Sequence, residues 1–118
     1  MLIVPGFQLS PQANKAVELP QDIELALQAI ADRLDALEPE DLDYDQSDGI
    51  LAIELENNGT KIILSRQSAT QQIWLAEPER GWHFDFKDGA WIDDVRGREL
   101  LAWLSELLSR YGTEKVAL

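Results

Sequence analysis

The sequence predicts an α+β fold, a two-layer sandwich in which two antiparallel helices pack on one face of an antiparallel sheet. Two amphipathic helical patterns lie toward the ends of the chain, and several short alternating segments joined by turn residues lie between them. A meander of strands has one face to cover, and helices that flank it in sequence can lie across that face. With 118 residues and 45% hydrophobic content, the chain suits one domain with its own core.

The first helix is predicted to begin near Pro20 and to end before Pro39. Proline is accepted in the first turn of a helix and stops a helix when it follows the last turn. The apolar residues that recur on one helical stripe are Ile23, Leu27, Ile30, Leu34 and Leu37. Residues 1–18 lack such a pattern, so we expect them to form an irregular N-terminal extension and residues 19–118 to form the single domain.

Turn residues divide the middle of the chain into short strands. The predicted turns are Asp48-Gly49, Asn57-Asn58-Gly59 and Asp88-Gly89. The alternating apolar residues expected on the core face are Leu51, Ile53, Leu55, Trp82, Phe84 and Phe86. Strands are also expected over residues 61–66 and 72–76, and a last short strand around Trp91.

The second helix is predicted to start near Arg98 and to stop at Gly112. Its apolar face combines Leu100, Leu104, Leu107 and Tyr111 with Leu101, Trp103 and Leu108. After it, Val116 and Leu118 are expected to lie in the groove between the helix ends.

Charge and composition narrow the classes of function. The net charge is −12, and residues 1–48 carry 11 acidic and only 2 basic side chains. Such a chain repels phosphate backbones and anionic lipid, so we expect cationic partners and neither nucleic acid nor membrane. The absence of cysteine excludes disulfides and thiolate metal sites. The N-terminus lacks the features of a signal or transit peptide, which favours a cytoplasmic protein.

Carboxylates crowd the end of the first helix and the strand that follows it. Asp32 and Asp35 are one helical turn apart, so they share a face. Asp41, Asp43 and Asp45 are spaced by two, so they should project from one side of a strand while Leu42 and Tyr44 point away. The whole group is Asp32, Asp35, Glu38, Glu40, Asp41, Asp43 and Asp45.

We expect these side chains to form a continuous carboxylate ridge. Carboxylate oxygens suit cations such as Fe²⁺, Mn²⁺, Mg²⁺ and Ca²⁺, but a row along a surface cannot enclose an ion, so binding should be weak. Two alternatives stay open. The ridge can be a merely solvated acidic face, or it can dock onto a basic partner without any metal.

In Gln72-Ile73-Trp74-Leu75, alternation points Ile73 and Leu75 to the core and Trp74 to the other face. An exposed tryptophan is a common anchor for a protein partner. The alternative is that Trp74 lies under a loop or a second layer. His83, the only histidine, is expected to point outward as an auxiliary metal ligand, a partner contact or neither.

Catalysis finds little support in the sequence. No Ser-His-Asp order and no glycine-rich phosphate loop can be recognised, and only His83 has an unperturbed pKa near neutrality. A ferroxidase is not favoured either, because it needs a buried site that combines histidine with bridging carboxylates. We therefore expect a protein that is not an enzyme.

From about Asp32 to Leu108 the chain resembles the frataxin family, in particular its bacterial iron-donor branch. The segments that carry the resemblance are Asp48-Gly49-Ile50-Leu51, Gly59-Thr60-Lys61-Ile62-Ile63, Arg66-Gln67, Gln72-Ile73-Trp74-Leu75, His83-Phe84-Asp85 and Trp91. It implies an iron site on Asp32, Asp35, Glu38, Asp41, Asp43 and Asp45. It implies a partner surface on Gln67, Gln72, Trp74 and His83.

The resemblance also implies a function. Frataxins bind iron (Fe²⁺ or Fe³⁺) weakly and engage a cysteine desulfurase and a scaffold protein, as iron donor or regulator of iron-sulfur cluster assembly. The alternative is a metal-independent acidic adaptor or inhibitor of the desulfurase. A monomer is expected, with an iron-dependent oligomer as the second possibility. This chain departs from the family pattern at Ala36, where many relatives have an acid, and at Ser65, where relatives usually have asparagine.

Overall fold

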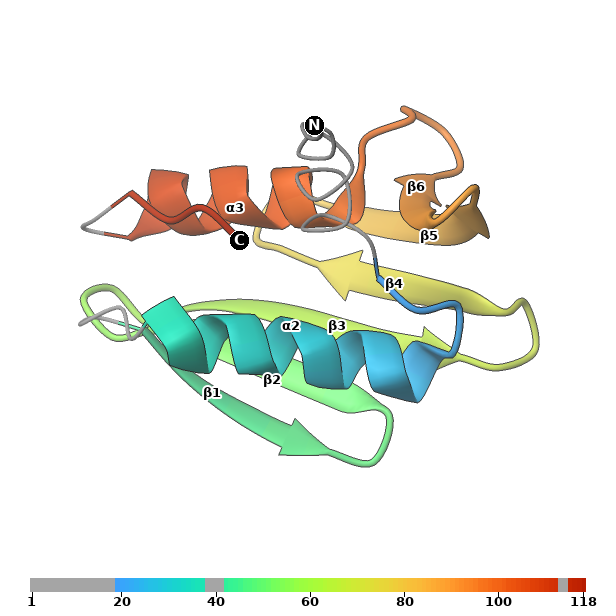
Figure 1. Ribbon diagram of the computed structural model, residues 1–118. Helices are drawn as coiled ribbons and strands as arrows, with labels where there is room; N and C mark the ends of the chain where they lie inside the picture. Colours follow the sequence, from blue (N-terminus) through green and yellow to red (C-terminus); the bar gives the residue numbers. More distant parts are fainter. Residues whose placement is uncertain (1–18, 38–41, 113–114) are drawn as a thin grey trace, which may run out of the picture.

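The computed structural model describes residues 19–37, 42–112 and 115–118; the expected extension 1–18 lies outside them. The elements are α2 (Ile23–Leu37), β1 (Leu42–Ser47), β2 (Ile50–Leu55), β3 (Thr60–Gln67), β4 (Gln72–Ala76), β5 (Gly81–Lys87), β6 (Ala90–Asp93) and α3 (Leu100–Tyr111). The six strands form one antiparallel sheet in chain order from β1 to β6. Both helices cover one face of this sheet (Figure 1), so the predicted two-layer α+β sandwich is confirmed.

The direction of the helices differs from the prediction. They run the same way across the sheet rather than antiparallel (Figure 1). A tight turn after β6 would have reversed α3 relative to α2. Instead, the chain loops back after Asp93, and Glu99 forms an antiparallel bridge with Ile92 before the helix begins. The start of α2 lies near β6, where Trp91 Nε1 donates to the Pro20 carbonyl, and the end of α3 lies at the β2–β3 turn, where Asn58 donates to the Tyr111 carbonyl.

The core lies between the helices and the sheet, and the alternation predicted it well. The buried strand residues include Leu51, Ile53, Leu55, Ile62, Leu64, Ile73, Leu75, Trp82 and Phe84. Of the predicted stripe on α2, Leu37 is the exception. It is 47% exposed, because it ends the helix and lines a shallow hollow with the tail residues Ala117 and Leu118. Phe86 is half-buried and meets the ring of Trp91 edge-on. No helix in the described part of the chain is long and apolar enough to cross a membrane.

The tail is fastened to the helices as predicted. Val116 is buried, and Ser109 Oγ both donates to its carbonyl and accepts from its N–H, at 3.1 and 2.8 Å. Ser105 Oγ accepts from the N–H of Leu118, and Arg33 donates to the Leu118 carbonyl. Two serines of α3 and one arginine of α2 therefore connect the tail to both helices.

Ser109→Ala is expected to destabilise the fold, because the change leaves two backbone groups of Val116 without their partner. Losing such hydrogen bonds in a partly buried place costs about 1–3 kcal/mol. Urea unfolding measures the loss, with Ser68→Ala as the control, since Ser68 is exposed in the β3–β4 turn. Equal stability of the two variants would show that the Ser109 contacts contribute nothing.

Candidate functional site: the β1 edge and the open sheet face

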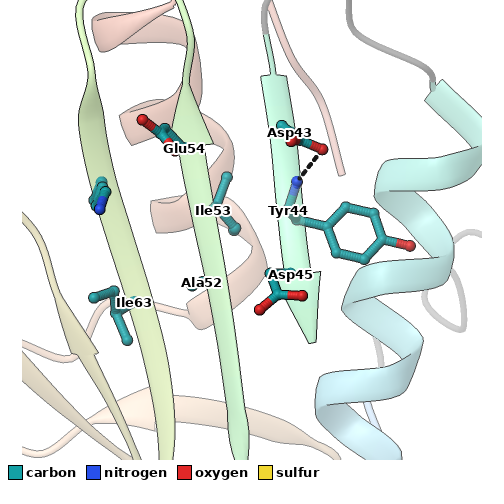
Figure 2. Close-up of a pocket in the computed structure, with 8 residues that line it drawn as sticks. Asp43, Tyr44, Asp45, Ala52, Ile53, Glu54 and Ile63 are labelled. Carbon is teal, nitrogen blue, oxygen red and sulfur yellow. Dashed lines mark hydrogen bonds between the residues drawn. The ribbon is translucent and has the colours of Figure 1, made fainter. Parts of the chain in front are cut away.

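Two of the predicted carboxylates lie on the outer surface of α2. Asp32 and Asp35 are both exposed. Asp32 Oδ1 accepts a hydrogen bond of 2.9 Å from Gln28 Nε2. Asp35 lies close to the hydroxyl of Tyr44, whose ring extends from β1 toward α2 (Figure 2). The helix carboxylates thus meet the side of β1 that faces the helical layer.

The pKa of the Tyr44 phenol depends on the carboxylates of α2 that lie near it. Hydrogen bonding to Asp35 raises the pKa of the Tyr44 phenol above its ordinary value, and desolvation and the negative charges of Asp35 and Asp32 add to the effect. Because the folded pKa is the higher one, the stabilisation from this contact is complete below the unfolded value. It is lost as the pH rises through the folded pKa.

Asp35→Asn is therefore expected to lower the pKa of Tyr44 toward the ordinary tyrosine value of about 10. Tyrosinate absorbance against pH measures it, in a Tyr111→Phe background that removes the only other tyrosine. Asp22→Asn serves as the control, because Asp22 lies at the opposite end of α2 and caps Leu25. An unchanged Tyr44 titration in Asp35→Asn would contradict the proposed contact.

The other two described carboxylates lie on the open face of the sheet. Asp43 and Asp45 are exposed, and alternation places them opposite Leu42 and Tyr44, which are half-buried. They line a hollow of about 260 Å³ together with Ala52, Glu54, Lys61 and Ile63 (Figure 2). Strand register brings Asp43 beside Glu54 and Glu54 beside Lys61. Three carboxylates and one amine therefore share this part of the surface.

Among the described residues, the carboxylates of the predicted ridge lie on two sides of the β1 edge. Asp32 and Asp35 belong to the helix side of the β1 edge, whereas Asp43 and Asp45 belong to its open face, with the Tyr44 ring directed to the helix side. Glu38, Glu40 and Asp41 lie outside the described residues. Within 19–37, 42–112 and 115–118, no three His, Asp or Glu side chains converge to hold a metal ion.

The predicted partner surface lies further along the same open face. Ile73 and Leu75 are buried, as predicted, and Trp74 is half-buried on the other side. Register aligns Ser65, Trp74 and His83 across β3, β4 and β5. The Trp74 and His83 rings stack with centroids 4.3 Å apart and an interplanar angle of 21°. His83 Nδ1 lies 3.9 Å from Asp94 Oδ2.

Gln72 differs from the expectation of an exposed contact. It is only 9% exposed, because its amide lies in a network of side chains. Its Nε2 donates to Asp85 Oδ1 at 3.1 Å and to Asp94 Oδ2 at 3.0 Å, and its Oε1 accepts from Trp74 Nε1 at 2.9 Å. Gln67 is half-buried and donates to Ser65 Oγ. Of the four predicted partner residues, Trp74 and His83 form one stacked pair.

Sequence reasoning missed several residues of these surfaces. Glu54 and Lys61 could have been found, because counting outward from the Asp48-Gly49 turn places Glu54 beside Asp43, and counting from the Asn57-Asn58-Gly59 turn places Lys61 beside Glu54. Asp94 could not, because the loop that follows β6 has no periodicity to indicate where its side chains lie. The exposed apolar residues Ile50 and Ile63 also follow from the alternation of β2 and β3.

Comparison with known proteins decides the family. The model of the frataxin-like domain matches residues 14–114 of the chain. The chain belongs to the frataxin family. Two bacterial proteins named iron-sulfur cluster assembly protein CyaY are similar to it. The protein of Tolumonas auensis is 45% identical over 78 residues, which cover 66% of this chain and 74% of that protein. The protein of Paraburkholderia phymatum is 41% identical over 93 residues, which cover 79% and 87%.

Solved frataxins agree with this family and with its bacterial CyaY branch. Frataxin from Psychromonas ingrahamii superposes with a TM-score of 0.71 at 40% identity, over 76% of this chain and 84% of that one. A trimeric frataxin from the yeast Saccharomyces cerevisiae, described as complexed with ferrous, superposes with a TM-score of 0.63 at 28% identity, over 71% and 79%.

Proposed function

We propose that this frataxin-family protein acts in the cytoplasm in iron-sulfur cluster assembly, binding iron weakly at its acidic β1 edge and docking on a cysteine desulfurase and a scaffold protein. The observation that carries the proposal is the similarity, at 41–45% identity, to bacterial proteins named for iron-sulfur cluster assembly. The monomer is the expected acting form, although the yeast relative solved with ferrous is trimeric.

The acidic edge supports weak iron binding. This name covers the carboxylates on both sides of β1, which are Asp32 and Asp35 on one side and Asp43, Asp45 and Glu54 on the other. They supply oxygen ligands of the kind that Fe²⁺ accepts. All of these side chains are on the surface of helix or strand, where water completes the coordination of an ion. Such a site exchanges iron readily, which suits a protein that passes iron on or senses its level.

The open face supports the docking part of the proposal. The Trp74–His83 stack offers a flat aromatic surface, and Ile50 and Ile63 add exposed apolar area at 42% and 37% exposure. Aromatic residues flanked by apolar and polar groups are typical of the centre of a protein interface. Asp43 and Asp45 lie on the same face, so a partner with basic residues can contact both the stack and the carboxylates.

A metal-independent adaptor is the second candidate, favoured by one observation. No group of three converging ligands occurs in the part of the chain that the structure describes. In that case the carboxylates act only as a charge pattern that matches a basic partner.

Replacing Asp43 and Asp45 by asparagine distinguishes the iron-linked function from the metal-independent adaptor, because asparagine has nearly the size of aspartate but carries no charge. Desulfurase affinity is measured by calorimetry, with and without Fe²⁺ and at low and high salt. The iron-linked function predicts that iron changes the affinity of the parent protein and not that of the variant. If the desulfurase affinity changes neither with iron nor with salt concentration, the acidic edge does not act as a docking surface.

A further inference from the structure

Two tryptophans outside the proposed iron and partner surfaces lie under a group of arginines. Trp82 of β5 and Trp103 of α3 are buried at 4% and 5% exposure, and their ring centroids are 4.7 Å apart. Arg96 and Arg80 lie over the Trp82 ring at 4.9 and 5.9 Å. Arg98 and Arg110 lie over the Trp103 ring at 4.3 and 5.4 Å. These four arginines are called the arginine cluster below.

The stacking leaves hydrogen-bond donors free for another molecule. A guanidinium that stacks on an aromatic ring uses its flat face, so the N–H groups around its edge stay available for carboxylate oxygens. Arg98 and Arg110 share one carboxylate, that of Glu106, at 3.4 and 2.8 Å. Arg80 and Arg96 have no carboxylate partner among the described residues.

The cluster holds more donors than acceptors. Glu77 accepts from Trp82 Nε1 at 3.0 Å, but Trp103 Nε1 has no acceptor within the described residues. Four guanidinium groups thus share the one paired carboxylate of Glu106, in a chain whose net charge is −12. A ligand that brings acceptor oxygens satisfies the guanidinium donors that the protein leaves unused, whereas the buried Trp103 N–H lies out of its reach.

The arginine cluster also lies apart from the acidic edge. Its residues come from the β4–β5 turn, the loop after β6, and α3, whereas the acidic edge lies on α2 and β1, across the sheet (Figure 1). A partner on one surface therefore leaves the other free. Val95 lies beside Arg96 in the same loop and is 77% exposed, the largest exposure among the large apolar residues that the structure describes.

We propose that the arginine cluster binds an acidic polypeptide segment of a partner protein. Successive Asp or Glu side chains of such a segment accept from the edges of Arg80, Arg96, Arg98 and Arg110, and an apolar residue of the segment contacts Val95. An inorganic anion uses one or two guanidinium edges and gains nothing from Val95. This surface is independent of the function proposed for the acidic edge and is tested separately from it.

The test titrates the isotope-labelled full chain with a short blocked peptide of glutamate and leucine, and follows each backbone amide by NMR. Shifts are expected at the arginine cluster and at Val95, and they should weaken as salt is added. Arg80→Gln with Arg96→Gln should weaken binding by at least about fivefold, because it removes two charge-assisted contacts without breaking an ion pair. Lys87→Gln with Lys115→Gln removes the same charge outside the cluster and should leave the affinity unchanged.

Three results would overturn the proposal. An equal loss in both double variants would mean that the peptide responds only to net charge. The same shifts with inorganic phosphate at equal affinity, Val95 unaffected, would indicate a general anion site. Shifts at the cluster that grow with protein concentration alone would mean that a second copy of the chain occupies it.

Discussion

Trp74→Ala is expected to weaken binding to the proposed partner, a cysteine desulfurase, by more than tenfold, which corresponds to about 1.4 kcal/mol or more. The indole stacks on His83 and donates to Gln72, so it presents a fixed aromatic surface on the open face. Its removal takes away the largest side chain of the proposed interface. Calorimetric titration with the purified desulfurase measures the loss.

The same variant should lose little stability, because Trp74 is only half-buried and lies outside the core. We expect a loss of about 1–2 kcal/mol for Trp74→Ala, against about 3–5 kcal/mol for Phe84→Ala, which empties a fully buried position. Leu25→Ala, an exposed apolar residue on α2, is the matched control and should leave binding unchanged. Full affinity in Trp74→Ala, or a stability loss as large as that of Phe84→Ala, would contradict this account.

Reversing the charge of the open-face carboxylates is expected to have an even larger effect. Asp43→Lys with Asp45→Lys should weaken desulfurase binding by at least about a hundredfold, because attraction to a basic partner becomes repulsion. The double variant should also remove the contribution of this face to iron binding. Both side chains are exposed, so the fold should remain. Affinity at several salt concentrations measures the effect.

A matched control shows whether the loss of affinity comes from the position of the new charges or only from the change in net charge. Glu79→Lys with Asp88→Lys changes the net charge by the same amount at exposed turn residues beside β5, at the other end of the sheet from β1. Its desulfurase affinity should stay close to that of the parent protein. If both double variants lose affinity equally, the partner responds to overall charge and the acidic edge has no special role.

The fold could be predicted largely because its pattern is local. Alternation alone assigned Ile53, Ile73 and Phe84 to the core, and the turn at Gly49, with φ of 72°, fixed the β1–β2 register. The relative direction of the helices could not be predicted. It depends on how the loop after Asp93 returns to pair Glu99 with Ile92, and no periodic pattern indicates such a path.

The sites were predicted less completely than the fold. Spacing correctly placed Asp43 and Asp45 on one side of β1, but it could not show that Tyr44 would accompany Asp35 on the other side. The outward alternation of Gln72 was right, yet its burial depends on Asp85 and Asp94, which reach it from other elements. The exposure of a side chain depends on such neighbours from other elements, so it cannot be predicted from the spacing of residues along one strand.

The most direct test of the proposed iron-linked function is an anaerobic titration of the isotope-labelled protein with Fe²⁺, with every backbone amide followed by NMR. The account predicts paramagnetic broadening confined to the acidic edge, at Asp32, Asp35, Asp43, Asp45 and Glu54 and the amides around them. The broadening should weaken in the Asp43→Asn and Asp45→Asn double variant. Broadening that is absent or spread over the whole surface would contradict iron binding at this edge and favour the metal-independent adaptor.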